Sequence, residues 1–514
     1  MMASDSGAAD HTLAVAGLAV AIPGLAQTCL HVLRATILQC QSLANAPDEI
    51  QDLLLRIDVA SERIDASLQI LKDAAPAMNF RLQSLLSRLL SRLQSVLVEL
   101  QTRTGQTALA TNTIASEGRL RQLLSKNSIE GSLDHLQRWQ MDFDGLILSL
   151  AMSGRLVSIQ GGPGIAVRLA DAVQRADSFR NAFLGNLSVA ASQSLGAILP
   201  EAKNECPIKY SKAFLPGPQD RSQFRVIVEY RSVDSATPYD AVPRLAQMLH
   251  AADPNMMALL RCNAYHGNRL SYEIPTGLKQ EPKTLRQLLL EDDGQPKHSL
   301  DERLGLLTQL ASALHFVHVA GNVHKQVRPD NILTFQKTTP FTSSASHDKT
   351  LGRCFLVGFD LSRGTGNRSE RHGPSEVEKN IYLPLDRQGS QVHARNFSQW
   401  DDVYSFGVVA LELALWNSFV TLRKSKTSAE SFELSSSLGL KGLNATDLYN
   451  RFCKLAVREV PTVLGQTFAV MVFDCLTCLK PVNDSPLKQK LRGDAERPGA
   501  GAEYILQELL TLSL

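Results

Sequence analysis

This 514-residue sequence is poor in cysteine, in aromatic residues and in net charge, and each shortage excludes a class of protein. Eight cysteines are too few for the disulfide framework of a small secreted domain and indicate reduced intracellular thiols. With 44% hydrophobic, 20% charged and 6% aromatic residues, the composition excludes wholesale disorder and collagen-like repeats. The net charge is only +2, so the sequence predicts no nucleic-acid partner.

The N-terminal segment lacks positive charge, because no lysine or arginine precedes Arg34. A secretory signal begins with a positively charged region, so we predict none and expect a cytoplasmic protein. Residues 12–33 are nevertheless uncharged, and about 20 apolar residues are enough to cross a bilayer. The first interpretation is a buried core helix that is kinked at Pro23. The alternative is a segment that leaves the core and associates with a membrane on activation.

Residues 1–153 carry the spacing of amphipathic helices. Apolar residues recur at steps of three and four along 50–71, 82–100 and 129–150, and turn-forming or capping residues separate these stretches. Several long helices with short connections predict an all-α antiparallel bundle. A glycine-rich break at 161–164 marks the next segment, and we interpret 154–204 as a connector that carries one helix.

The pattern changes at about residue 205. Short β-type stretches at 224–230, 259–265 and 270–274 surround an expected helix at 240–250. Longer helical stretches follow at 284–291, 300–320, 401–417, 464–479 and 502–513. Strands followed by helices predict a bilobal α+β domain over 205–514, with a small strand-rich lobe and a larger helical lobe. The fold class is therefore multidomain, with an N-terminal helical bundle and a C-terminal α+β part.

Five landmarks in this C-terminal part resemble the motifs of protein kinases, in the same order and with similar spacing. Residues 323–333, VHKQVRPDNIL, resemble the catalytic loop, and 355–363, FLVGFDLSR, resemble the stretch that contains D-F-G. Residues 382–389, YLPLDRQG, stand where kinases carry A-P-E, and 402–407, DVYSFG, resemble the D-V-W-S-x-G helix. Arg497 fits the late kinase arginine. The resemblance implies a protein-kinase-like fold for 205–514.

The residues that perform phosphoryl transfer are missing from these motifs. The reaction needs an aspartate in the catalytic loop, an aspartate on the metal and a lysine on the phosphates. Gln326 replaces the first, Gly358 the second, and Arg328 stands at the catalytic-loop lysine. No G-x-G-x-x-G motif is present, and the strand lysine corresponds to Glu229 or Arg231. We therefore expect no phosphotransferase activity, no bound metal and no cofactor.

Some kinase positions are retained. Asn331 matches a metal ligand of active kinases and, with Arg231, is a weak candidate for contacting ATP, should nucleotide bind at all. The resemblance implies structural roles for the others. Asp402 would brace the catalytic loop, and Asp386 would pair with Arg497. His324 and Phe359 are expected to pack and form hydrogen bonds inside the domain. A kinase-like sequence that keeps the structural residues and has lost the catalytic ones is typical of a pseudokinase.

The amino-acid sequences of these motifs, together with residues 15–29 (VAGLAVAIPGLAQTC), also resemble those of a group of filamentous-fungal proteins. These join a HeLo or HeLo-like, prion-inhibition and propagation domain to a kinase-like domain. The resemblance implies a cell-death or heterokaryon-incompatibility effector whose helical bundle acts on membrane lipids. One alternative is a scaffold in which the pseudokinase binds a protein partner and the bundle self-associates. The other is a divergent kinase that binds ATP.

Overall fold

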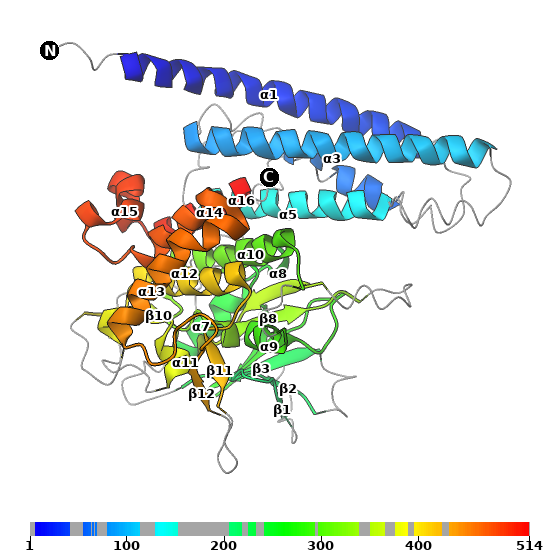
Figure 1. The fold of residues 1–514 in the computed structure, drawn as a ribbon. Helices are drawn as coiled ribbons and strands as arrows, with labels where there is room; N and C mark the ends of the chain where they lie inside the picture. The colour runs from blue at the N-terminus through cyan, green and yellow to red at the C-terminus, as the bar shows by residue number, and fades with distance from the viewer. Residues whose placement is uncertain are drawn as a thin grey trace. The chain divides into compact units, whose positions relative to one another are not determined.

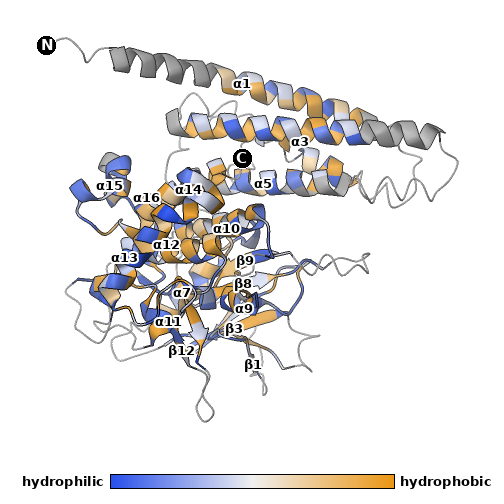
Figure 2. Cartoon of the chain, in the orientation of Figure 1, coloured by the Kyte–Doolittle hydropathy of each residue, from blue (hydrophilic) through white to orange (hydrophobic). Residues whose placement is uncertain are grey.

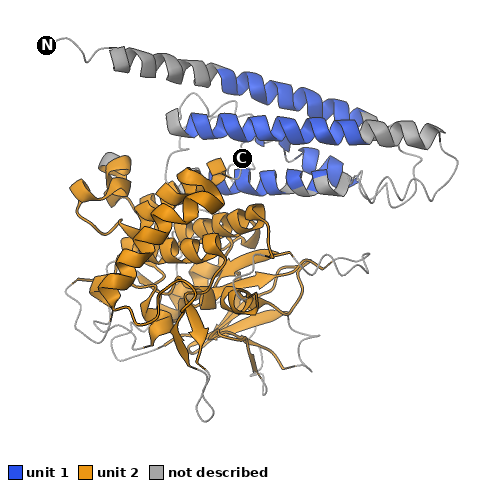
Figure 3. Cartoon of the chain, in the orientation of Figure 1, with its two compact units in different colours: residues 1–176, 514 blue, residues 177–513 orange. Residues whose placement is uncertain are grey.

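We describe the protein from a computed structural model. The described residues are 6–41, 55–62, 64–65, 67–68, 80–113, 129–152, 205–217, 225–232, 241–292, 297–338, 350–364, 376–388, 395–423 and 431–512. The chain divides into two compact units, residues 1–176 with Leu514 and residues 177–513 (Figure 3). The division falls inside the expected connector 154–204, which lies outside the described residues.

The N-terminal unit is helical in its described parts. Its long helices are α1 (Ser6–Gln41), α3 (Phe80–Thr113) and α5 (Ile129–Met152), and shorter helical stretches lie within 55–68 (Figure 1). α3 packs against both α1 and α5. The spacing of apolar residues explains this packing, since each helix buries a stripe of apolar side chains (Figure 2). On α3 the buried stripe follows the predicted one: Leu82, Leu86, Leu89, Leu93, Val96 and Leu100.

Helix α1 differs from the expected kinked helix, because it runs through Pro23 as one element. Ile22, Cys29 and Leu33 are fully or almost fully buried on one face, while Gln27 is exposed on another. Among the described residues, one helix is long and apolar enough to cross a membrane, with the window Ala21–Leu38 and a mean hydropathy of 1.2. A bent pair of helices in the C-terminal unit, 445–458 and 460–476, passes the same test together. A soluble protein's core helix passes it too, so neither finding decides between the two interpretations of this segment.

The C-terminal unit begins with a five-stranded antiparallel sheet in the order β1-β2-β3-β5-β4. Its strands are β1 (Cys206–Pro207), β2 (Phe214–Leu215), β3 (Val226–Tyr230), β4 (Cys262–His266) and β5 (Arg269–Glu273). Helix α7 (Ala241–His250) packs on β4 and is followed by the short α8 (Pro254–Met257). β3 is buried along most of its length, which places its side chains against the rest of the unit.

The rest of this unit consists mainly of helices around small antiparallel sheets. α10 (Leu300–Val319), α12 (Gln399–Leu415), α14 (Val460–Leu476) and α16 (Ala500–Leu512) pack on one another and form its core. The remaining helices are α9 (Leu285–Glu291), α11 (Val377–Asn380), α13 (Ala445–Arg458) and α15 (Pro486–Leu491). A three-stranded sheet has the order β6-β8-β9, from Lys283–Thr284, Ile332–Phe335 and Arg353–Leu356. Two-stranded sheets pair β7 (Asn322–Val323) with β10 (Arg363–Gly364), and β11 (Val420–Leu422) with β12 (Phe432–Leu434).

The mixed α+β content predicted for this part of the chain is observed. The three predicted strands correspond to β3, β4 and β5, and each predicted helix from 240–250 to 502–513 has a counterpart that differs by only a few residues at its ends. Helix α13 was not predicted, although Asn444 caps its first turn and the apolar face Leu448, Phe452 and Leu455 has helical spacing. The short strands β1, β2, β6, β7, β10, β11 and β12 were also missed, because two or three residues are too few to show an alternating pattern, and the four-residue strands β8 and β9 were missed as well.

Candidate functional site

The segment that resembles a catalytic loop is held by Asp402, which lies near the start of α12. Its carboxylate accepts hydrogen bonds from the backbone N–H groups of His324 and Lys325, each at 2.8 Å. It also lies 3.0 Å from Nε2 of His318, near the end of α10. Lys325 has a left-handed backbone with φ of 72°, an uncommon conformation for a residue other than glycine. A fully buried carboxylate therefore fixes the shape of this loop.

His324 points into the interior and takes part in packing. Burial lowers the pKa of its imidazole to about 4, so the ring is neutral at physiological pH. Its Nδ1 accepts a bond from the N–H of Gln326 at 3.3 Å, and its ring meets that of Phe359 edge to face at 4.7 Å. Phe359 is itself 2% exposed. A neutral, buried histidine in these contacts is placed to support the loop.

Gln326 and Arg328 occupy the positions where kinases carry the catalytic aspartate and lysine. The amide nitrogen of Gln326 donates to the carboxylate of Asp360 and lies 3.4 Å from the carbonyl oxygen of Gly358. The guanidinium of Arg328 is buried, with Nε 3.8 Å from a carboxylate oxygen of Asp330. An amide cannot accept a hydroxyl proton as a carboxylate does, so this loop has no general base at that position.

Gly358, at the position of the metal-binding aspartate, has no room for a side chain. Its φ is +85°, in the left-handed region that favours glycine. A Cβ atom built there would lie 2.3 Å from Cγ of Asn331 and 2.5 Å from its Nδ2. The Asn331 side chain therefore fills the space that an aspartate would need. Its Nδ2 donates to the backbone oxygen of Gln326 at 2.9 Å, which binds the amide into the loop.

Glu229 on β3 reaches the same turn from the sheet. Its carboxylate accepts hydrogen bonds from the N–H of Gly358 at 2.6 Å and from the N–H of Phe359 at 3.4 Å, and a third from the Tyr272 hydroxyl at 3.0 Å. Burial raises the pKa of this carboxyl to about 7, although the bonds from Gly358 and Tyr272 act in the opposite direction. Glu229 is thus an acidic group at one of the two positions that match the kinase strand lysine, and Arg231 stands at the other.

Two cations from the sheet also bind this turn. Arg231 is 6% exposed, and its guanidinium donates to the carbonyl oxygens of Phe359, at 3.3 Å, and Ser362. Lys212, in the turn between β1 and β2, lies 2.6 Å from a carboxylate oxygen of Asp360. In both of the weak candidates for ATP contact, the two terminal nitrogens of Arg231 and Nδ2 of Asn331 are therefore bonded to the protein's own backbone.

These contacts limit the chemistry of the site. The carboxylates that reach the 358–362 turn are already bonded, because Glu229 accepts from backbone N–H groups and Asp360 bonds to Lys212 and Gln326. Among the residues that the structure describes, no group of three His, Cys, Asp or Glu side chains is placed to hold a metal ion. The arrangement offers hydrogen bonding and packing, without a free base or a lysine aimed at a phosphate.

The predicted pairing of Asp386 with Arg497 is wrong. Asp386 lies in the short helical turn η6 (Leu385–Arg387) and bonds to Arg395, at 2.7 Å, with half of its side chain exposed. Arg497 instead forms an ion pair with Glu503 in the first turn of α16. The motif comparison failed because Arg395 lies only nine residues after Asp386 and is close enough to take its place.

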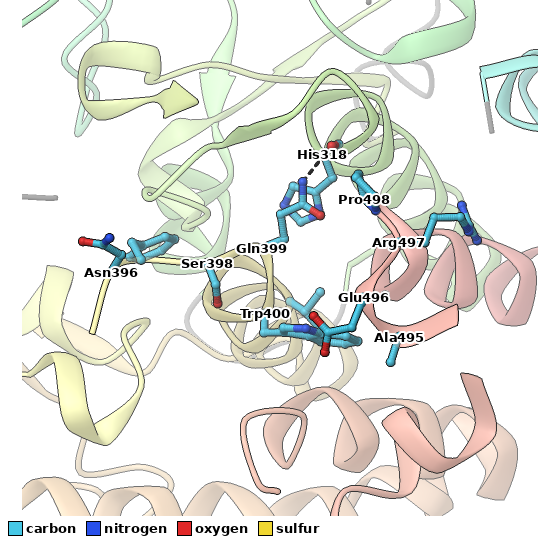
Figure 4. Close-up of a pocket in the computed structure, with 12 residues that line it drawn as sticks. His318, Asn396, Ser398, Gln399, Trp400, Ala495, Glu496, Arg497 and Pro498 are labelled. Atoms are coloured by element: carbon cyan, nitrogen blue, oxygen red, sulfur yellow. Dashed lines mark hydrogen bonds between the residues drawn. The ribbon is translucent and has the colours of Figure 1, made fainter. Parts of the chain in front are cut away.

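A pocket of about 320 Å³ lies elsewhere in the unit, where the end of α10 and the starts of α12 and α16 meet (Figure 4). Gln399 points to the carbonyl oxygen of His318 and donates to it at 2.7 Å, as the dashed line shows. Trp400 and Glu496 lie beside one another at its edge. Of the predicted site residues only Arg497 lines this pocket, and Val403 of the 402–407 motif lines it as well.

Comparisons with known proteins agree with the motifs. The chain is 30% identical over 138 residues to a probable serine/threonine-protein kinase of Clostridium acetobutylicum, covering 26% of this chain and 17% of that protein. It is 29% identical over 137 residues to a protein kinase and PP2C-like domain-containing protein of Arabidopsis thaliana, covering 26% of this chain and 20% of the relative. The chain spans a fifth or less of the length of these curated relatives. No family model matches it. This weak homology supports a kinase-like domain.

Sequence reasoning identified most of the residues at this site and missed how they bond. Glu229 was considered only as a replacement for a lysine, and neither Lys212 nor a role for Asp360 was predicted. One signal was present, because Glu229 is an acidic residue inside the apolar strand sequence VIVEY. A carboxylate in a buried strand requires a hydrogen-bonding partner, and that requirement could have directed attention to it.

Proposed function

We propose that the kinase-like part of this chain is a pseudokinase that regulates or recruits other components without transferring phosphate. One observation carries the proposal: the Asn331 side chain occupies the space in which a metal-binding side chain at position 358 would lie. Gln326 at the base position supports it, since the amide provides no proton acceptor of the required strength. Neither ATP nor a metal is needed for this function, and ATP binding belongs to the alternative of a divergent kinase.

Two assays on the full-length chain test this proposal. In the first, the protein is incubated with magnesium and labelled ATP and a general kinase substrate, beside the variant Asn331→Ala. We expect no transfer, and transfer that the variant abolishes would contradict the proposal. In the second, the melting temperature is measured against magnesium–ATP. A ligand at 100 times its dissociation constant adds ~2.7 kcal/mol, so a clear saturable rise would favour the divergent kinase.

We propose further that the N-terminal helical unit is the effector and that the kinase-like part restrains it. In this proposal the unit acts on membrane lipids in a cell-death or incompatibility response. The support is the apolar window Ala21–Leu38 in α1, together with the resemblance of residues 15–29 to HeLo-type domains. The protein would be cytoplasmic at rest and membrane-associated after activation.

The membrane proposal is tested with dye-loaded vesicles that contain an anionic lipid. We compare residues 1–176 with the full chain and expect greater leakage from the shorter protein. Gln27→Glu places a charge on an exposed face of α1, so it should leave the fold intact. A charge costs at least ~2.5 kcal/mol at the bilayer centre and less towards the ends, and Gln27 lies off the centre of the window Ala21–Leu38, so this variant should lose part of its leakage. The control is Ser95→Glu on an exposed face of α3, which should change nothing.

The second candidate function is a scaffold, in which the kinase-like part binds a protein partner and the helical unit self-associates. The exposed apolar side chains Leu55, Val59 and Val98 of the helical unit favour a protein–protein role. A unit that leaves vesicles intact and forms a concentration-dependent oligomer in sedimentation would favour the scaffold. Leakage that depends on the identity of residue 27 would favour the effector.

A further inference from the structure

The backbone N–H groups of the turn at residues 358–362 form a small concavity of the kind that binds anions. Gly358 is left-handed, and the three residues that follow form the short helical turn η5 (Phe359–Leu361). Successive N–H groups in this combination of conformations point to one side and form a concavity that suits an anion. The N–H groups of Gly358 and Phe359 both point to the carboxylate of Glu229. The occupant of the concavity is therefore a side chain of the same protein.

The contact joins segments that are distant in sequence. Glu229 and Gly358 are 129 residues apart, and the carboxylate is 4% exposed. Arg231, which directly follows β3, binds the carbonyl oxygens of Phe359 and Ser362. The donors of the turn thus meet an anion from β3, and its acceptors meet a cation from the chain directly after β3. This match of charge to backbone polarity joins the sheet to the turn.

A third contact reinforces the same arrangement. Lys212 comes from the β1–β2 turn and pairs with Asp360, whose side chain is 4% exposed. Asp360 lies inside the turn, between the two residues whose carbonyl oxygens bind Arg231. Two separate parts of the five-stranded sheet therefore hold one five-residue turn.

We propose that Glu229 is an internal ligand, whose carboxylate occupies the anion site of the 358–362 turn and, with Arg231 and Lys212, ties the sheet to that turn without any bound nucleotide. The device is autoinhibitory in a physical sense, because an external anion reaches these N–H groups only by displacing Glu229. It concerns the site of the proposed function but does not depend on it, since an active enzyme could also carry this contact.

The test measures amide hydrogen exchange of the full-length protein at pH 8, where the Glu229 carboxyl is ionised. In Glu229→Ala we expect the amides of Gly358 and Phe359, followed in a peptide spanning 355–363, to exchange at least tenfold faster than in the wild type. Sodium formate should restore slow exchange in this variant, while sodium chloride at equal ionic strength should not. The control is Glu273→Ala, an exposed carboxylate on β5 of the same sheet, which should leave this peptide unchanged.

Two results would overturn the inference. Exchange within twofold of the wild type in Glu229→Ala would mean that the carboxylate does not protect these amides. Faster exchange that formate fails to reverse would show a loss of packing in place of a lost ligand. If Glu229→Ala does not fold, Glu229→Met replaces it, since methionine has a similar size and no oxygen acceptor, and unchanged exchange in that variant again overturns the inference. The phosphate-transfer and ATP-binding assays are independent of these readouts, so the two proposals fail separately.

Discussion

Replacing Gly358 by alanine tests whether the site excludes a side chain at the position of the metal-binding aspartate. Two penalties are expected. The left-handed backbone, with φ of +85°, costs an alanine about 1–2 kcal/mol. The new methyl group would lie 2.3 Å from Cγ of Asn331, and forcing an extra carbon into a packed region costs about 1–3 kcal/mol. The free energy of unfolding should therefore fall by about 2–5 kcal/mol.

Two other glycines separate these penalties. Gly267 has a φ of +57° and no atom within 4 Å of an added Cβ, so Gly267→Ala should show the backbone penalty alone. Gly305 lies in α10 with open space around its Cβ position, and Gly305→Ala should stabilise the helix by about 0.5–1 kcal/mol. The loss in free energy of unfolding should be larger for Gly358→Ala than for Gly267→Ala, and the difference measures the collision with Asn331.

Urea unfolding of the full-length variants, followed by circular dichroism and fluorescence, provides the measurement. The double variant Gly358→Ala/Asn331→Ala removes the obstructing side chain. Because the two residues are in contact, we expect a coupling free energy of about 1–3 kcal/mol in the double-mutant cycle. If Gly358→Ala costs no more than Gly267→Ala, or if the cycle shows no coupling, Asn331 does not fill the site and the reasoning is refuted.

Other contacts make further predictions. Arg395→Ala should destabilise the protein more than Asp386→Ala, because it removes a partner of the fully buried Asp401, which keeps only Arg387 at 3.5 Å and Ser398, whereas Asp386→Ala should cost under about 1 kcal/mol since half of that side chain is exposed; urea unfolding of both variants checks this. The pKa of Glu229 is raised to about 7 from 4.5, so the folded protein holds this proton more tightly than the unfolded chain does. The protonated Glu229 side chain therefore adds about 3 kcal/mol to the free energy of unfolding below about pH 4.5. This contribution is lost as the pH rises to about 7. The difference in stability between wild type and Glu229→Gln should change by this amount between pH 4.5 and 8, and a constant difference would contradict it.

The local elements of this protein follow from its sequence. α12 illustrates why, since Ser398 and Asp401 form a capping box at its start and the residues that follow are almost continuously apolar. The buried stripe of α3 and the strand sequence VIVEY are equally visible as patterns of period 3.6 and of apolar β residues. The missing aspartates at positions 326 and 358 were likewise apparent from sequence. Such features depend on neighbours within a few residues, which the sequence contains directly.

Only the tertiary structure decided which distant groups meet. Arg395 and Arg497 were both available to pair with Asp386, and the choice depended on where the chain before α12 runs. The carboxylate of Glu229 and the N–H of Gly358 lie 129 residues apart in the chain, and no periodic pattern encodes their contact. A hydrogen bond needs its atoms within about 3 Å, and burial makes an unmatched polar group costly. The sequence by itself therefore determined the longer helices, the strands β3 to β5 and the absence of aspartate at positions 326 and 358, whereas the packing of the elements decided what fills the site.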